Sequence, residues 1–412
     1  MDWQSYLSKM EQHHIVATGL QYLSTISPAQ WCQIFYLLAA GCVLIVASTP
    51  AEARTLLINY GARKASTTTP QSSAEGAQQR PGPRPSSTVG ESEKGQDQIG
   101  QGQGRISTGR HEDQRETLGN KQTPNAFVSL ISLVTSYGQV PHSWFAAFYI
   151  VSVGCSLFWA SQYVLYVRNK GDDGAFLNSA LGLIAAKQVA SSSTTDSSGG
   201  LMMINHVQLA VAWSMMFLQG SRRVYEHMVI MRPSKSTMWF VHWVLGLGFY
   251  MVTNVAVWVE GSETILGSAA QPNSPNPPRP LNEILSPQVL VKLAIGTATF
   301  LYAYTHQYTT HAHLASLRKY SLPSSDPNNE SGGTRLFRYL VCPHYTCECL
   351  VYLAIAITAA PAGQVVSKTL LCGLVFVVAN LGVTARGTRA WYVDKFGKDA
   401  VEGKWNMIPF VF

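Results

Sequence analysis

The residues best suited to chemistry in this sequence are a histidine and a carboxylate near the start of an apolar segment, His344 and Glu348. Their spacing places both side chains on the same face of a helix. An ionisable side chain is costly to keep inside a membrane helix, so such residues mark functional sites by default. We therefore expect His344 and Glu348 to line a polar pocket that opens to the cytosol. The alternative is a structural hydrogen bond to a neighbouring helix.

A second polar group is the segment LQGSRRVYE at 218–226. Tyr225 and Glu226 fall within one helical turn, where a phenol can donate a proton and an adjacent carboxylate can tune it. This pair is the candidate for the catalytic proton donor. Arg222 and Arg223 have an ordinary alternative explanation, because basic residues commonly mark the cytoplasmic end of a membrane helix.

Three histidines and two basic residues occur in HQYTTHAHLASLRKY at 306–320. We predict no metal here, because the HxxHH and HxxxH boxes that membrane di-iron hydroxylases and desaturases share are absent from the sequence. His311, Arg318 and Lys319 could instead bind the phosphates of a cofactor, since guanidinium groups match phosphate geometry. The alternative is a solvated helix at the membrane interface.

The composition requires these residues to be positioned by membrane helices. The 412-residue chain is 46% hydrophobic and 13% charged, against about 25% charged in a soluble domain. A helix needs about 20 apolar residues to cross the bilayer core. We predict an all-α integral membrane protein, a bundle of seven transmembrane helices, at 31–49, 142–167, 201–220, 237–259, 288–308, 344–361 and 367–385. Because no GxGxxG follows a strand and no GxxxxGK[ST] occurs, a dinucleotide would have to be held by this bundle.

Polar stretches divide the chain. Residues 62–123 are rich in Ser, Thr, Gln, Gly and Pro without apolar periodicity, which predicts a disordered cytosolic insert. Before it we expect a lumenal N-terminal segment over 1–30 and the first membrane helix with its flank over 31–61. After it, residues 124–412 form the rest of the membrane domain, with the catalytic and cofactor region at about 288–412.

Basic residues in the short loops set the expected orientation. Loops 221–236 and 309–343 and the tail from 386 carry most of them, on one side of a seven-span bundle. The N-terminus is therefore predicted to be lumenal and the C-terminus cytosolic. Nucleic-acid binding is not expected from the net charge of +7, because no basic stripe with interleaved aromatic residues occurs. Polar stretches at 188–200 and 269–280 are expected to be loops.

Five segments together resemble the steroid 5-alpha-reductase family, and within it the polyprenol reductase branch. They are VPHSWFAAFYIVSV at 140–153, LQGSRRVYE at 218–226, HQYTTHAHLASLRKY at 306–320, PHYTCECLVYLAIA at 343–356 and WYVDKFGKDAVEGKWNMIPFVF at 391–412. The resemblance implies an NADPH-dependent reductase of the endoplasmic reticulum membrane with seven helices. The cofactor would enter from the cytosol, and a lipid-like substrate would enter from the bilayer.

The resemblance also implies roles for single residues. His344 and Glu348 match the family's polar pair that contacts the cofactor. Tyr392 matches its cofactor-binding tyrosine, Arg318 its phosphate-side arginine and Arg223 the arginine that ends the third helix; His311 stands where steroid reductases have an Asp. The implied cofactor-binding set is Arg223, His311, Arg318, His344, Glu348 and Tyr392. The tail departs from the family pattern at residues 399–401, where a Tyr-Pro pair is usual.

Chemistry constrains the substrate that this resemblance implies, a long-chain polyisoprenoid drawn from the membrane lipids for dolichol synthesis and protein N-glycosylation. An allylic alcohol such as polyprenol has no group that can accept the electron pair displaced by a hydride. The conjugated aldehyde, polyprenal, does, because its oxygen can take up the charge. The alternatives are a steroid or enoyl-thioester reductase of the same fold, an isoprenylcysteine methyltransferase that uses S-adenosylmethionine, and a scaffold or channel. The oligomeric state is left open.

Overall fold

The computed structural model describes residues 25–58, 126–168, 179–192, 204–232, 236–269, 286–317, 322–323 and 335–412. The insert predicted at 62–123, most of the N-terminal segment 1–30, most of the loops predicted at 188–200 and 269–280, and Arg318 lie outside these residues.

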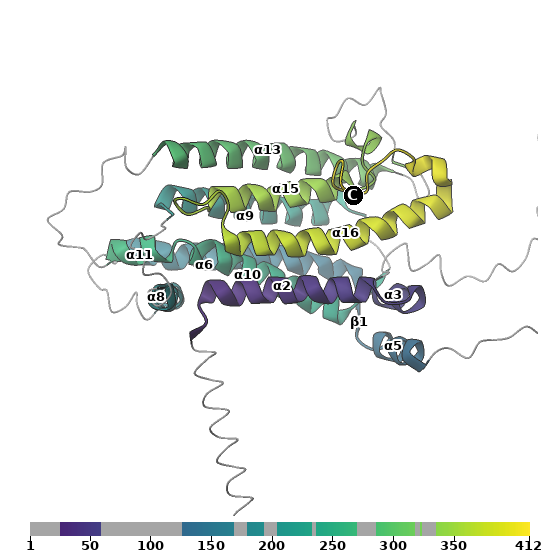
Figure 1. Ribbon diagram of the computed structural model, residues 1–412, viewed down its shortest axis with the longest axis horizontal. Helices are drawn as coiled ribbons and strands as arrows, with labels where there is room; N and C mark the ends of the chain where they lie inside the picture. Colours follow the sequence, from purple (N-terminus) through teal and green to yellow (C-terminus); the bar gives the residue numbers. More distant parts are fainter. Residues whose placement is uncertain are drawn as a thin grey trace, which may run out of the picture.

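Each of the seven predicted spans coincides with a helix. The helices are α2 (Pro28–Ala47), α6 (Phe145–Arg168), α9 (His206–Tyr225), α10 (Phe240–Val259), α13 (Pro287–Ser316), α15 (Pro343–Thr358) and α16 (Lys368–Phe396). Figure 1 shows them stacked with their axes roughly aligned. Among the described helices, four are long and apolar enough to cross a membrane, namely α2, α6 with the preceding turn η1 (His142–Trp144), α10 and α16. The membrane class is therefore supported, while α9, α13 and α15 fall short of these length and composition limits.

Local sequence signals fix where the helices begin. Ser27 accepts a 3.1 Å hydrogen bond from the backbone N–H of Gln30, and the Gln30 side chain accepts one of 2.8 Å from the backbone of Ser27. This reciprocal pair, followed by Pro28, forms a capping box at the start of α2. Asn205 and Gln208 form the same arrangement at α9. Gln208 also donates to the carbonyls of residues 358 and 360, so the start of α9 is attached to the end of α15.

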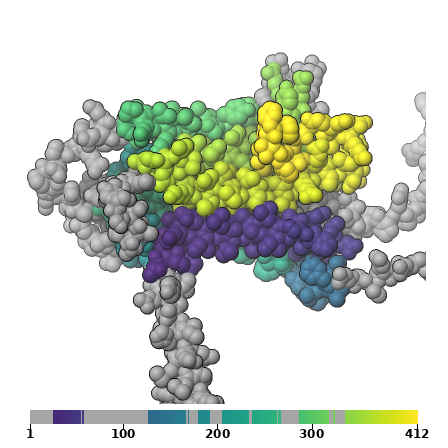
Figure 2. All heavy atoms as spheres, in the orientation of Figure 1, coloured from purple at the N-terminus to yellow at the C-terminus, as the bar shows by residue number. Residues whose placement is uncertain are grey.

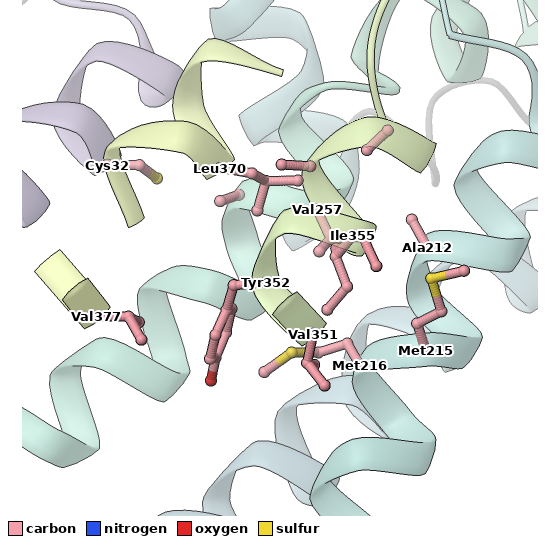
Figure 3. Close-up of a cluster of buried hydrophobic side chains, with 14 of the residues drawn as sticks. Cys32, Ala212, Met215, Met216, Val257, Val351, Tyr352, Ile355, Leu370 and Val377 are labelled. Carbon is pink, nitrogen blue, oxygen red and sulfur yellow. The ribbon is translucent and has the colours of Figure 1, made fainter. Parts of the chain in front are cut away.

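The bundle is held together by helices that are distant in the sequence. α2 packs along α16, as Figures 1 and 2 show, and α13 packs along α15. A Cβ added at Gly296 of α13 would lie 3.1 Å from the Ala354 carbonyl oxygen of α15, so these two helices approach closely. The apolar core between the helices is drawn in Figure 3, where side chains from five of them converge: Cys32, Ala212, Met216, Val257, Val351, Ile355, Leu370 and Val377.

Short helices that the sequence did not predict cover the ends of the bundle. They are α3 (Ala51–Ile58), α5 (Ala126–Ser136), α8 (Ala180–Ser192) and α11 (Ser262–Ala269). The prediction of a loop from residue 188 onward is wrong for 188–192, which continue α8. Tertiary contacts explain this, because Leu181 and Ala185 are buried against the bundle and Gln188 accepts a hydrogen bond from the backbone of Ala29.

A two-stranded antiparallel sheet joins two loops at one end of the bundle. It pairs β1 (Gln139–Pro141) with β2 (Thr237–Trp239), with Val140 opposite Met238. Gly138, which has φ +70°, precedes β1, and its carbonyl accepts a hydrogen bond from the backbone of Phe240. The sheet therefore holds the start of α6 beside the start of α10.

The C-terminal tail is attached to the start of α15. After α16 and the turn η4 (Lys398–Val401), Trp405 pairs with Leu340 as a parallel bridge next to the turn η3 (Leu336–Arg338). The Thr346 hydroxyl donates a 2.5 Å hydrogen bond to the carbonyl of Met407. These contacts fix the first turn of α15, which carries His344.

Candidate active site

A cavity of about 1050 Å³ lies within the bundle and is lined mainly by residues of α2, α6, α9, α10, α13, α15, α16 and the π-helical turn η2 (Glu226–Ile230). Five of the eight residues predicted from the sequence line it: Arg223, His311, His344, Glu348 and Tyr392. The structure thus brings together residues from four different helices that are far apart along the chain.

A buried ion cluster forms one wall of the site. Glu226, which directly follows α9, is fully buried and accepts hydrogen bonds from Arg222 at 2.5 Å and from Arg223. Its other contact is with Nδ1 of His311, at 2.8 Å. Burial by itself would raise the pKa of the Glu226 carboxyl, but the hydrogen bond with His311 and the charges of the two arginines lower that pKa to about 2. Glu226 is therefore an anion that holds Arg223 and His311 in place.

Two glutamines connect this cluster to Glu348. Gln307 of α13 donates to Glu348 Oε2, and Gln219 of α9 donates to the same oxygen at 3.2 Å. The Gln219 carbonyl in turn accepts a 2.6 Å hydrogen bond from Arg222. Glu348 is thereby oriented by neutral donors, and the network links α9, α13 and α15.

His344 has a polar atom without a protein partner. Its Nδ1 is buried, and no hydrogen-bond partner for it is found among the described residues. The ring lies 5.6 Å from that of His311, centroid to centroid, and both rings line the cavity. An unpaired buried nitrogen is costly unless a ligand or water satisfies it, so His344 is suited to contact a polar ligand.

A polar stripe on α16 faces the same cavity. Asn380, Thr384, Thr388 and Tyr392 recur every four residues, so they occupy one face of the helix, and all four line the cavity. Amide and hydroxyl groups in such a row can bond to the hydroxyls and amide of a dinucleotide. Together with Arg223, His311 and His344, they provide a polar surface suited to a polar ligand.

The remaining lining of the cavity is largely apolar. It comes mainly from α2, α6, α10 and the middle of α16, and includes Val43, Val46, Phe148, Leu245, Phe249, Phe376 and Val377. A cavity with a few convergent polar groups and extended apolar walls is the usual form of a site for a lipid-like ligand.

Tyr225 is not brought together with the other predicted residues. It is 49% exposed and lines a separate shallow groove with Tyr304 and Tyr308, between α9 and α13. A helix turns about 100° per residue, so Arg223 and Tyr225 point in very different directions from α9. We therefore correct the sequence-based placement of Tyr225 at the reaction centre. Glu226 does not line the cavity, and its contacts assign it a positioning role.

Sequence reasoning missed Tyr149, Gln219 and Gln307 and treated Arg222 as a topology marker. Tyr149 of α6 lines the cavity, and its hydroxyl accepts a 2.6 Å hydrogen bond from Arg223. All four residues lie within segments that carry the family resemblance. Charged residues and histidines stand out in an apolar sequence, whereas two amides and a phenol complete the hydrogen-bond network.

Comparisons with known proteins agree with this geometry. Residues 283–412 match the family described as 3-oxo-5-alpha-steroid 4-dehydrogenase. The chain is 26% identical over 298 residues to polyprenal reductase 1 of Oryza sativa subsp. indica, which covers 66% of this chain and 79% of the relative. It is 30% identical over 202 residues to the polyprenal reductase of Saccharomyces cerevisiae, covering 49% of this chain and 64% of the relative. With polyprenal reductase 1 of Arabidopsis thaliana it is 32% identical over 189 residues, covering 42% and 56%.

Four helices long and apolar enough to cross a membrane, together with these comparisons, indicate a membrane-bound reductase. The match of residues 283–412 to this family and the similarity to polyprenal reductases confirm the resemblance predicted from the motifs.

Proposed function

We propose that this protein reduces the α-isoprene double bond of a polyprenal with NADPH, as a step of dolichol synthesis in the endoplasmic reticulum membrane. The observation that carries the proposal is the single cavity in which a polar end, built by Arg223, His344 and Glu348, continues into apolar walls. The relatives named polyprenal reductase support the substrate class.

The residues present suit a dinucleotide at the polar end. Arg223 and His311 offer a cationic and a hydrogen-bonding group at this end, while the α16 stripe offers hydroxyls and an amide. The buried Nδ1 of His344, which has no hydrogen-bond partner among the described residues, could bond to a polar group of the cofactor. When bound, NADPH supplies the hydride. We assign Arg223, His311, His344, Glu348 and Tyr392 to hold it, and keep Arg318, which lies outside the described residues, as a further cofactor-binding residue on the family resemblance alone.

The chain's own groups explain why a conjugated aldehyde suits the site. Hydride addition at the β carbon moves negative charge onto the aldehyde oxygen, which needs a cation or a hydrogen-bond donor beside it. Arg223 places a guanidinium at the cavity surface and is itself fixed by Glu226. Polyprenol lacks a carbonyl, so it gives these groups no developing charge to stabilise.

We further propose seven membrane crossings with the N-terminus lumenal and the C-terminus cytosolic. Contacts among the helices support this, because α9 packs on α6 and α10, α15 packs on α16, and α13 packs along α15 and α9. Their polar side chains point to one another and into the cavity, as in the Gln219–Gln307 bond, so they need not face lipid.

The proposal is tested by NADPH oxidation with detergent-purified protein, comparing polyprenal, polyprenol and a 3-oxo-4-ene steroid. We expect turnover with polyprenal and none with polyprenol in the absence of a dehydrogenase. Equal turnover of polyprenol would refute the aldehyde as the species reduced. Preference for the steroid would instead support the activity after which the matching family is described.

A further inference from the structure

Tyr149 is a buried tyrosine in the wall of the cavity, and none of the roles assigned so far uses its proton. It is 6% exposed, and its hydroxyl oxygen lies 2.6 Å from Nη2 of Arg223. The Cζ atom of Arg223 is also 4.7 Å from the centre of the Tyr149 ring. One cation therefore contacts both the oxygen and the ring of this phenol.

The direction of that hydrogen bond leaves the phenol proton available. A guanidinium only donates, so the Tyr149 oxygen is the acceptor and its own O–H must point elsewhere. Among the described residues, no other hydrogen bond of the Tyr149 hydroxyl is found. Because Tyr149 lines the cavity, a ligand oxygen there is the natural acceptor.

Arg223 is fixed in a position that favours proton release from Tyr149. Glu226 accepts from Nη1 of Arg223, while Nη2 contacts Tyr149, so the guanidinium bridges the carboxylate and the phenol. A cation held beside the oxygen stabilises the negative charge that remains when the proton leaves, without further rearrangement.

Other tyrosines of the cavity lack this arrangement. Tyr250 faces Tyr149 with ring centroids 5.8 Å apart, and Tyr352 lines the same cavity. Among the described residues, no hydrogen bond from an arginine to the hydroxyl of either of these tyrosines is found. The charged and titratable groups around Tyr149 are Arg223 of α9, Glu226 and His227 of η2, Tyr250 of α10 and Glu348 of α15.

We propose that Tyr149 is the proton donor of the reduction, an assignment that rests on the proposed function. The β carbon takes a hydride from NADPH, which is oxidised to NADP⁺, and the displaced π electrons form an enolate. The O–H bond of Tyr149 breaks, and its proton goes to the enolate oxygen. The resulting enol tautomerises to the saturated aldehyde, and the phenolate regains a proton from water.

The first test compares two phenol deletions, Tyr149→Phe and Tyr225→Phe. We expect Y149F to lose about 10²–10⁴-fold in turnover, the usual contribution of a general acid. NADPH affinity, followed by quenching of tryptophan fluorescence, should change far less than turnover in Y149F, because Arg223 keeps its contact with Glu226 when the hydroxyl is removed. Y225F should retain its turnover. Loss of turnover in Y225F with a normal rate in Y149F would overturn the proposal.

A second variant separates catalysis from packing. A fluorinated tyrosine placed at 149 keeps the hydroxyl and the ring shape but makes the phenol more acidic. If Tyr149 donates the proton, the alkaline limb of the kcat profile should shift to lower pH, which a purely structural role would not produce. An unshifted profile would overturn the proposal. Absence of polyprenal turnover in the wild-type protein would instead be a failure of the proposed function itself.

Discussion

The carboxylate of Glu226 provides the sharpest test of the ion cluster that supports the site. Glu226 is fully buried and contacts Arg222 at 2.5 Å, His311 at 2.8 Å, and Arg223. Glu226→Gln preserves its shape but removes its charge. Two guanidinium groups would then lack a carboxylate within contact distance among the described residues. Removing one partner from a buried ion pair costs about 3–5 kcal/mol.

The lowered pKa of Glu226 gives a second value for the free energy of the same interaction. Lowering the pKa of a carboxyl from 4.5 to about 2 on folding corresponds to about 3 kcal/mol of stabilisation. Because the pKa is lower in the folded protein, this stabilisation is present above the unfolded-state pKa and is lost as the pH falls towards 2. The two free energies, one from breaking the ion pair and one from the pKa, agree in order of magnitude.

Thermal unfolding of the detergent-purified protein measures this effect. We expect E226Q to lower the Tm by roughly 6–10 °C, taking about 2 °C per kcal/mol for a large domain. Glu402→Gln is the matched control, since it makes the same chemical change at an exposed position. The wild-type Tm should also fall on acidification more steeply than that of E226Q. Equal Tm values for E226Q, E402Q and wild type would refute the buried ion cluster.

Three further predictions concern the cavity. Glu348→Ala should lower turnover by at least about tenfold, since a charged hydrogen-bond acceptor is lost, and should reduce dolichol in cells that depend on this protein; unchanged dolichol would favour a scaffold. His344→Ala should weaken NADPH affinity by about tenfold, the worth of one good hydrogen bond, and unaltered binding would remove His344 from the cofactor site. Gly246→Ala should raise the KM for polyprenal more than the KM for NADPH. The reason is that the new Cβ would lie 2.7 Å from the Phe148 ring and push that ring into the cavity. Gly154→Ala is the control, because no atom lies within 4 Å of its added Cβ; equal KM values for polyprenal in the two variants would contradict a role of Phe148 in substrate binding.

The sequence predicted the helices of the bundle and much of the cavity's polar end. Apolar runs of sufficient length predicted helices such as α2 and α16. The four-residue spacing of His344 and Glu348 predicted that both lie on one face of α15. These signals are local, because helix periodicity and the cost of a buried charge can be read along a single segment.

What the sequence did not predict depends on contacts between segments. The short helices α5 and α8 have too few residues to give a membrane-span signal and are ordered by packing. Whether Tyr149 or Tyr225 faces the cavity depends on the rotation of α6 and α9 against each other, which a single sequence does not fix. Arg222 was interpreted as a topology marker for the same reason, since Glu226 and Gln307 become its partners only in the folded bundle.

The proposed reaction delivers a hydride, within one cavity, to the β carbon of a conjugated aldehyde. It is tested most directly by incubating the purified protein with polyprenal and NADPH deuterated at the transferable position, then locating the label by mass spectrometry. We expect one deuterium on the β carbon of a saturated aldehyde. Deuterium on the carbonyl carbon, with the double bond intact, would contradict it.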